Sequence, residues 1–213
     1  MARFYVNMAA MKLYTTKFAP NPRRVEIYLK EKGIDDIERV MVNLLKGEHR
    51  TPEFKQRNPL GLLPVLELDD GRVLTESLAI CQYLEELYPE PTLIGADPWR
   101  RAKTWEAVRL AELGLLGGAA SAFQHTQPYF AKTIDQQQVI AQDGQNRFAK
   151  YLRRIDRLLA DNEWLAGAQF TLADITAICA IDFGKVAGCV VPDDLAHVIR
   201  WLAAVRERPS CQL

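Results

Sequence analysis

Residues 62–77, LLPVLELDDGRVLTES, indicate the fold of this chain more clearly than any other segment. Pro64 has no backbone N–H to give to a sheet, so it marks the first residue of a strand or a special turn. The apolar run after it ends at Asp69-Asp70-Gly71, a sequence typical of a hairpin turn. We therefore expect two short strands, residues 65–68 and 72–74, joined by this turn.

The same stretch continues into a predicted helix whose N-terminus is open. Glu76 and Ser77 precede apolar residues near the helical period, which predicts a helix over residues 76–88. Ile80 stands three residues after Ser77, where a capping box would need Glu or Gln. The unpaired N–H groups of the first turn can then bind a carboxylate or phosphate. This segment indicates a small anionic ligand.

Composition excludes several classes of protein. The 213 residues carry 27 Lys and Arg against 27 Asp and Glu, which does not favour nucleic acid or an anionic membrane as a partner. No apolar run is long enough to span a bilayer. The four cysteines form no CxxC pair, and the three histidines have no metal-ligand spacing. We expect a cytoplasmic protein with reduced thiols and no metal, in which residues 1–10 are an N-terminal extension and not a secretory signal.

The chain divides into two predicted domains of different fold class. Three prolines and a glycine between positions 88 and 98 predict a linker at residues 89–97. Residues 11–88 follow the order β-α-β-(α)-β-β-α, which predicts an α+β domain with a mixed sheet. Residues 98–209 show only helical patterns, so we expect an all-α domain there. The expected strands cover residues 12–16, 38–43, 65–68 and 72–74, and the expected helices cover 21–32, 51–56, 76–88, 98–123 (loosened around Gly114 and Gly117-Gly118), 136–160, 171–183 and 192–207.

Several strings together resemble the cytosolic glutathione transferase superfamily, in particular bacterial theta- and nu-like members. The N-terminal strings are KLY (12–14), PRRVEI (22–27), NPLGLLPVL (58–66) and TESLAI (75–80). The C-terminal strings are WLAG (164–167) and FTLADI (170–175). The resemblance covers roughly residues 11–209. It implies a thioredoxin-like glutathione-binding domain followed by an all-α helical domain.

The resemblance assigns roles in glutathione binding to five residues. It implies a cis peptide bond before Pro64, with Leu63 pairing its backbone with the bound tripeptide. Ser77 would bind the γ-glutamyl carboxylate and Glu76 would face the ammonium. His49 would contact the glycine carboxylate, a role that Lys46 or Arg50 could also fill.

The sequence offers several candidates for the group that activates the thiol. The thiolate is the nucleophile, and an unperturbed thiol is only a few per cent ionised at neutral pH. Alignment on Arg24 and Val25 puts Ala19 where family members carry Ser or Cys, and alanine has no donor. Asn21 matches the asparagine whose amide contacts the sulfur in nu-like members, although it could instead be the N-cap of the first helix.

Other groups near the first helix could assist the sulfur. Thr15 and Thr16 are alternative donors, whereas Tyr14 lies within the strand and is expected in the core. The helix N-terminus supplies partial positive charge. Arg23 and Arg24 lie near this end, where cations oppose the helix dipole and a thiolate would offset the conflict. We expect one of the two to extend into water.

The second substrate is expected between the domains. Aromatic and imidazole side chains suited to an apolar electrophile come from the helix over residues 98–123 and the loop after it. They are Trp105, Phe123, His125, Tyr129 and Phe130.

Thr171 and Asp174 form a predicted capping box, flanked by Phe170 and Ile175 as a hydrophobic staple. We interpret this motif as structural.

The resemblance implies a homodimer in which the helices over residues 76–88 and 98–123 pack across a two-fold axis. The expected activity is a glutathione transferase that uses glutathione as cosubstrate and attacks an electrophilic, largely apolar second substrate. A glutathione-dependent disulfide or peroxide reductase and a non-catalytic glutathione binder are the alternatives.

Overall fold

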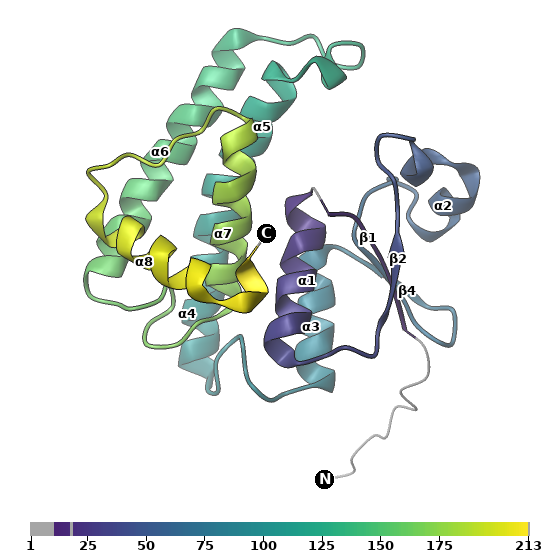
Figure 1. Cartoon of the computed structure of the whole chain (residues 1–213), viewed down its shortest axis with the longest axis horizontal. Helices are drawn as coiled ribbons and strands as arrows, with labels where there is room; N and C mark the ends of the chain where they lie inside the picture. The colour runs from purple at the N-terminus through teal and green to yellow at the C-terminus, as the bar shows by residue number, and fades with distance from the viewer. Residues whose placement is uncertain (1–10, 18, 213) are drawn as a thin grey trace. The chain divides into compact units, whose positions relative to one another are not determined.

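A computed structural model describes residues 11–17 and 19–212 of the chain. The chain forms two compact units, and the division falls between Pro91 and Thr92, within the predicted linker (Figure 1). The predicted N-terminal extension, residues 1–10, lies outside the described residues.

The first unit is a four-stranded mixed sheet with helices on both faces (Figure 1). The strand order is β2-β1-β3-β4, with β1 parallel to β2 and antiparallel to β3, and with β3 antiparallel to β4. The predicted order of elements and the predicted hairpin are both confirmed. The elements are β1 (Lys12–Thr15), α1 (Pro20–Lys32), β2 (Glu38–Met41), a 3₁₀ turn (Glu48–Arg50), α2 (Pro52–Arg57), β3 (Val65–Glu67), β4 (Val73–Thr75) and α3 (Ser77–Leu87).

Alternation along β1 separates the two faces of the sheet. Tyr14 packs edge-on against Phe54 of α2, with ring centroids 6.0 Å apart, and the two belong to a small core with Val42 and Val65. Tyr14 is thus in the core, as predicted, and its hydroxyl donates to Glu67. Its strand neighbours point to the opposite face, which α1 and α3 cover.

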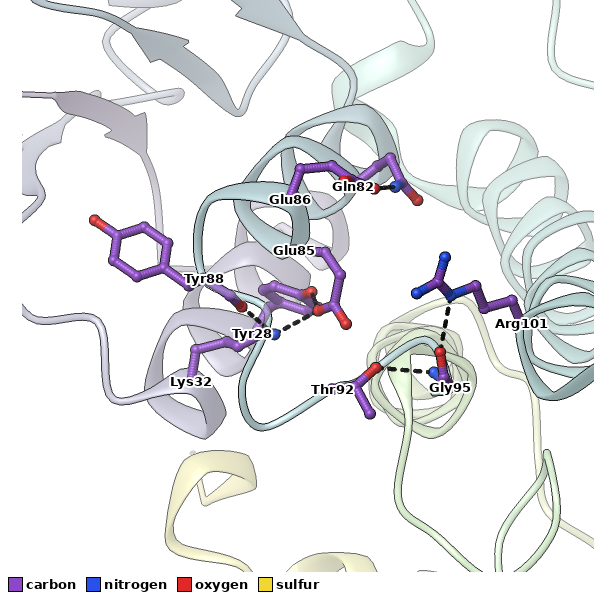
Figure 2. A network of polar contacts seen from close by, with 9 residues as sticks. All are labelled: Tyr28, Lys32, Gln82, Glu85, Glu86, Tyr88, Thr92, Gly95 and Arg101. Atoms are coloured by element: carbon purple, nitrogen blue, oxygen red, sulfur yellow. Dashed lines mark hydrogen bonds and ion pairs between the residues drawn. The ribbon is translucent and has the colours of Figure 1, made fainter. Parts of the chain in front are cut away.

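Buried polar contacts join α1 to α3 at both ends. Near the C-termini, the Nζ of Lys32 lies 2.5 Å from a carboxylate oxygen of Glu85 and 2.6 Å from the carbonyl oxygen of Tyr88 (Figure 2). The hydroxyl of Tyr28 donates to the same carboxylate, and burial and this bond raise the pKa of Tyr28. Near the N-termini, Arg24 donates to Ser77. The two helices therefore run parallel, with both N-termini at the same end.

The second unit is all helical, as predicted. Its elements are α4 (Pro98–Arg109), a π-helix (Leu110–Leu116), α5 (Gly117–Thr126), a 3₁₀ turn (Pro128–Phe130), α6 (Gln138–Ala160), α7 (Leu172–Val186), α8 (Ala196–Glu207) and a final 3₁₀ turn (Pro209–Cys211). Helix α7 is the centre of this unit, because most of its side chains are buried.

Part of the predicted linker belongs structurally to the second unit. Leu93 and Ile94 are buried, and the carbonyl oxygen of Leu93 accepts from the N–H of Leu172 at 2.8 Å. The N–H of Gly95 donates to Oγ1 of Thr92 at 3.1 Å, and the carbonyl oxygen of Gly95 accepts from Nε of Arg101 at 3.0 Å (Figure 2). These contacts fix residues 92–95 to the helices that follow.

The long helix predicted over residues 98–123 is not a regular α-helix. It contains the seven-residue π-helix, which includes Gly114, and it extends to Thr126. A Cβ on Gly114 would lie 1.9 Å from the ring of Tyr151, so the ring occupies the space of the missing side chain. The loosening predicted around the glycines is therefore a stretch with i→i+5 hydrogen bonds. Its wider turn rotates the side chains that follow relative to those of a regular α-helix.

The capping box of α7 is confirmed. Thr171 is the N-cap, and its N–H donates to Asp174 at 2.9 Å. Asp174 is fully buried and also accepts from the N–H of Leu165 and the indole N–H of Trp201. Burial raises the pKa of Asp174 to about 6, although these donors act in the opposite direction. One carboxylate thus ties three segments of the second unit together.

This shift predicts how stability depends on pH. The folded protein holds the Asp174 proton to a higher pH than the unfolded chain, so the stability it contributes is greatest below pH 3.8 and is lost as pH rises through about 6. Relative to Asp174→Asn, the wild type should lose up to about 3 kcal/mol of unfolding free energy over this range. Urea unfolding at a series of pH values measures the difference, and a difference that stays constant would contradict the prediction.

Candidate glutathione site

The N-terminus of α3 is open, as the sequence predicts. Glu76 is the N-cap but its side chain makes no capping hydrogen bond to a described residue, and Ser77 is the first helical residue. The first helical bond runs from the N–H of Ile80 to the carbonyl oxygen of Glu76 at 2.9 Å. The N–H groups before Ile80 in this helix have no intrahelical acceptor, so they form an anion seat: the first turn of α3 from Ser77 to Ala79.

Glu76 holds a backbone conformation that non-glycine residues rarely adopt. Its φ is 69°, and it is the one non-glycine residue with positive φ in the described part of the chain. Such positions cost about 1–3 kcal/mol and occur mainly at functional sites. The strained residue lies directly at the anion seat, and its carboxylate is exposed.

Ser77 is 3% exposed, and its hydroxyl oxygen accepts a hydrogen bond from Nη1 of Arg24 at 2.6 Å. Arg24 is itself only 1% exposed, whereas Arg23 is half-buried. Of the two arginines, Arg24 is therefore not the one that extends into water. Sequence reasoning missed this contact because the two residues are 53 positions apart.

The loop before β3 has the backbone form that the resemblance implies. The Leu63–Pro64 peptide bond is cis, and Leu63 packs against the core around Phe54. The side chain of Asn58 holds this loop, because its Nδ2 donates to the carbonyl oxygen of Leu62 at 2.9 Å and its Oδ1 accepts from the N–H of Leu60 at 3.1 Å. Asn58 is a residue that sequence reasoning quoted but assigned no role.

His49 lies in the 3₁₀ turn before α2 and is 8% exposed. Its Nδ1 is buried and has no hydrogen-bond partner among residues 11–17 and 19–212. Burial, and to a smaller extent Arg50, lowers the pKa of His49, so the imidazole is neutral near pH 7. Its carbonyl oxygen would lie 2.7 Å from a Cβ on Gly61, so the turn packs closely on the loop that leads to Pro64.

The candidates for thiol activation lie at the end of β1 and the start of α1. Helix α1 begins at Pro20 with Ala19 as its N-cap, so the alternative that Asn21 is the N-cap is wrong. The Oδ1 of Asn21 and the Oγ1 of Thr15 are both buried, and neither has a partner in the described part of the chain. Thr15 and Thr16 are 2% and 8% exposed, so Asn21, which is half-buried, is the more accessible of the three.

The second unit brings together three of the five residues expected at the second substrate. The ring of Phe123 lies 5.6 Å from that of Phe130, which lies 5.0 Å from that of Tyr129. Phe183 of α7 joins this aromatic cluster, 4.9 Å from Phe123, and sequence reasoning did not include it.

The other two predicted residues have different surroundings. Trp105 is half-buried in α4, ahead of the π-helix. The Nδ1 of His125 accepts from the backbone N–H of Gln137 at 3.0 Å, so this imidazole holds the loop before α6.

Comparison with known proteins assigns the family. The pattern described as glutathione S-transferase, N-terminal domain, matches residues 13–92, and the corresponding C-terminal domain matches residues 119–209. Glutathione S-transferase 2 of Saccharomyces cerevisiae is 33% identical over 94% of this chain and 87% of its own length.

Solved structures agree with this assignment. A glutathione S-transferase domain-containing protein of Marinobacter aquaeolei is 37% identical, with a TM-score of 0.88 over 94% of this chain and all of the other. Gtt2 of Saccharomyces cerevisiae is 32% identical, with a TM-score of 0.87 over 94% of this chain and 98% of the other.

The chain belongs to the glutathione S-transferase family, and it is a glutathione transferase with a thioredoxin-like N-terminal domain. Members of this family use glutathione as cosubstrate. Among the described residues, no helix is long and apolar enough to cross a membrane. The same residues contain no group of three or more side chains arranged to hold a metal ion.

The strain at Glu76 predicts a gain in stability when it is relieved. Glycine adopts positive φ at little cost, so Glu76→Gly should raise the free energy of unfolding by about 1 kcal/mol. Glu76→Gln removes the charge but keeps the backbone strain, so it is the matched control and should not stabilise. Urea denaturation of both variants measures the effect. A Glu76→Gly variant no more stable than Glu76→Gln would show that the conformation is not strained.

Proposed function

We propose that this glutathione transferase holds the γ-glutamyl carboxylate of glutathione at the anion seat. The observation that carries the proposal is the open first turn of α3, where the buried Ser77 lies next to an exposed carboxylate on Glu76. A free α-amino acid end carries one negative and one positive group. The N–H groups and the Ser77 hydroxyl suit the carboxylate, and Glu76 suits the ammonium.

The rest of the tripeptide extends from this seat in the proposal. The backbone of Leu63 beside Pro64 pairs with the cysteinyl peptide, as a strand edge would. His49 binds the glycine carboxylate. Its buried Nδ1 has no hydrogen-bond partner within the described part of the chain, which supports a role beyond packing. Residues 11–88 form the glutathione-binding domain, residues 89–97 the linker and residues 98–209 the helical domain.

The sulfur is activated at the N-terminus of α1 in this proposal. The amide of Asn21 donates to the thiolate, and the helix N-terminus adds partial positive charge. Hydrogen bonds that favour the charged form lower the pKa of the thiol. The thiolate then attacks an electrophilic centre on an apolar substrate, and the aromatic cluster of Phe123, Tyr129, Phe130 and Phe183 offers the apolar surface.

Two further properties belong to the proposal. The protein is cytoplasmic, which its four buried, free cysteines support, because free thiols persist in a reducing compartment. It is also a homodimer that uses α3 and α4 at its interface, and light scattering on the purified protein measures this state.

Ser77→Ala tests the anion seat. The change removes the hydroxyl donor to the carboxylate, so glutathione binding should weaken by about 1–3 kcal/mol. Isothermal titration calorimetry with glutathione measures the loss. Thr133→Ala removes an exposed hydroxyl of the second unit and should leave the affinity unchanged. If Ser77→Ala binds glutathione as tightly as the wild type, the carboxylate does not bind at this seat.

Asn21→Ala tests the origin of thiol activation. Loss of the amide should raise the pKa of the bound thiol by about one unit, or about 1.4 kcal/mol, so kcat/KM should rise toward its plateau at higher pH. Thr15→Val is the matched comparison, because it removes the other buried polar group at similar volume. The pH dependence of kcat/KM for the electrophilic substrate, measured at saturating glutathione, reports the pKa of the bound thiol in both variants. A shift with Thr15→Val and none with Asn21→Ala would assign the role to Thr15.

A further inference from the structure

We propose that His49 binds the glycine carboxylate of glutathione as a neutral imidazole with its proton on Nε2, so that this end of the ligand is held equally well across the neutral pH range. This inference rests on the proposed binding of the glycine carboxylate at His49. It assigns the atom that contacts the ligand and its protonation state, which together set how the site responds to pH.

The burial of one ring nitrogen decides which nitrogen can meet the ligand. His49 is 8% exposed and its Nδ1 is buried, so the exposed part of the side chain does not include Nδ1. A carboxylate that approaches from the solvent can therefore contact only Nε2. A carboxylate only accepts hydrogen bonds, so Nε2 must carry a proton to bind it.

The surroundings of Nδ1 keep this nitrogen unprotonated. Neutral imidazole has one N–H donor and one acceptor nitrogen, whereas imidazolium has two N–H donors. Nδ1 has no hydrogen-bond partner among residues 11–17 and 19–212, and a buried N–H without an acceptor is strongly disfavoured. A ligand on Nε2 leaves Nδ1 buried. The second proton is therefore unfavourable both before and after the ligand binds.

Charged groups around the turn also disfavour an imidazolium. The ionisable residues of the loop before the turn, of the turn and of α2 are Lys46, Glu48, Arg50, Glu53, Lys55 and Arg57. Burial lowers the pKa of His49, Arg50 lowers it further, and no carboxylate among the described residues raises it. The carboxylate of Glu48 accepts instead from the N–H of Asn43 at 2.7 Å. The cations outnumber the carboxylates here, so this segment attracts the carboxylate of the ligand without a charge on His49.

Backbone packing holds the turn that carries His49. The N–H of Arg50 donates to the carbonyl oxygen of Gly47 at 2.8 Å, which closes the turn. Gly61 has a φ of 62°, and a Cβ on it would lie 2.7 Å from the carbonyl oxygen of His49. The turn and the loop before β3 are therefore in close contact. This contact sets the distance between His49 and Leu63, the two residues that we propose hold the middle and the end of the same tripeptide.

The experiment compares two ligands that differ only at the glycine end. S-methylglutathione and its glycine amide, in which a neutral carboxamide replaces the carboxylate, are titrated calorimetrically into the wild type, His49→Gln and His49→Asn at pH 6, 7 and 8. The methyl group removes the thiol proton, so thiol ionisation does not contribute. The variants are matched, because the amide nitrogen of glutamine lies near the position of Nε2 and that of asparagine near the position of Nδ1. Circular dichroism melting shows which variants are folded.

We expect the wild type to prefer S-methylglutathione over its amide by about 10- to 100-fold. The preference should be the same at all three pH values, because neither the carboxylate nor His49 changes its charge over this range. His49→Gln should keep the preference to within about threefold, since it presents a neutral N–H at the same place. His49→Asn should prefer S-methylglutathione about 10-fold less than the wild type does.

A spectroscopic measurement on the wild type makes the test independent of the variants. Long-range ¹H–¹⁵N spectra of the histidine rings separate the two nitrogens of a neutral ring, whereas the two nitrogens of an imidazolium give similar signals. His125 provides the reference, because its Nδ1 accepts from the N–H of Gln137 and its proton is therefore on Nε2. His49 should show the same pattern as His125 at pH 6.5, with and without S-methylglutathione.

Other outcomes separate this inference from the proposed function. If the wild type binds S-methylglutathione and its amide equally, the glycine carboxylate is not bound as proposed. If the preference of the wild type grows as the pH falls to 6 and that of His49→Gln does not, the carboxylate binds at His49 but the ring is an imidazolium, which overturns the inference. If both variants keep the preference, His49 does not contact the carboxylate, which also overturns it. If both lose the preference, the ring spectrum decides: a neutral ring supports the inference and an imidazolium overturns it.

Discussion

The geometry of the candidate glutathione site depends on the parallel pairing of α1 and α3. Two buried cations join the helices: Lys32 meets Glu85 at the C-terminal end, and Arg24 meets Ser77 at the N-terminal end. Removing one partner of a buried charged contact leaves the other without compensation, which is costly. The two contacts, Lys32 with Glu85 and Arg24 with Ser77, therefore hold the first turn of α3 level with the first turns of α1.

The site combines this rigid pair with a locally unfavourable backbone. Glu76 has positive φ where the chain leaves β4 and enters α3, and the helix begins without a side-chain cap. The surrounding sheet and helices impose this conformation, and the N–H groups of the first helical turn are where we propose that the carboxylate of glutathione binds. In α7 the opposite solution occurs, because Thr171 and Asp174 close the helix start with the chain's own side chains. The start of α7 is therefore closed by structural contacts, whereas the start of α3 is left open for the ligand that we propose.

Local patterns in the sequence predicted most of the architecture. The turn after β3, the open start of α3 and the capping box of α7 each depend on residues close together in the chain, and each is confirmed. Predicted helix ends differ by a few residues, because hydrogen bonding at the termini depends on the packed neighbours. The π-helix depends on contact between Gly114 and the distant Tyr151, so sequence patterns indicated only a loosened helix.

Periodicity, proline and turn residues act over short distances, so residue patterns were enough to predict the α+β and all-α halves, the family and the open helix start at Ser77. Three contacts appear only in the folded structure: Arg24 is buried against Ser77, Asn58 holds the loop before the cis proline, and Phe183 joins Phe123. Two of these three contacts join residues more than fifty positions apart in the chain. The direction of a side chain in such contacts is set by the packing of whole helices, which no local pattern records.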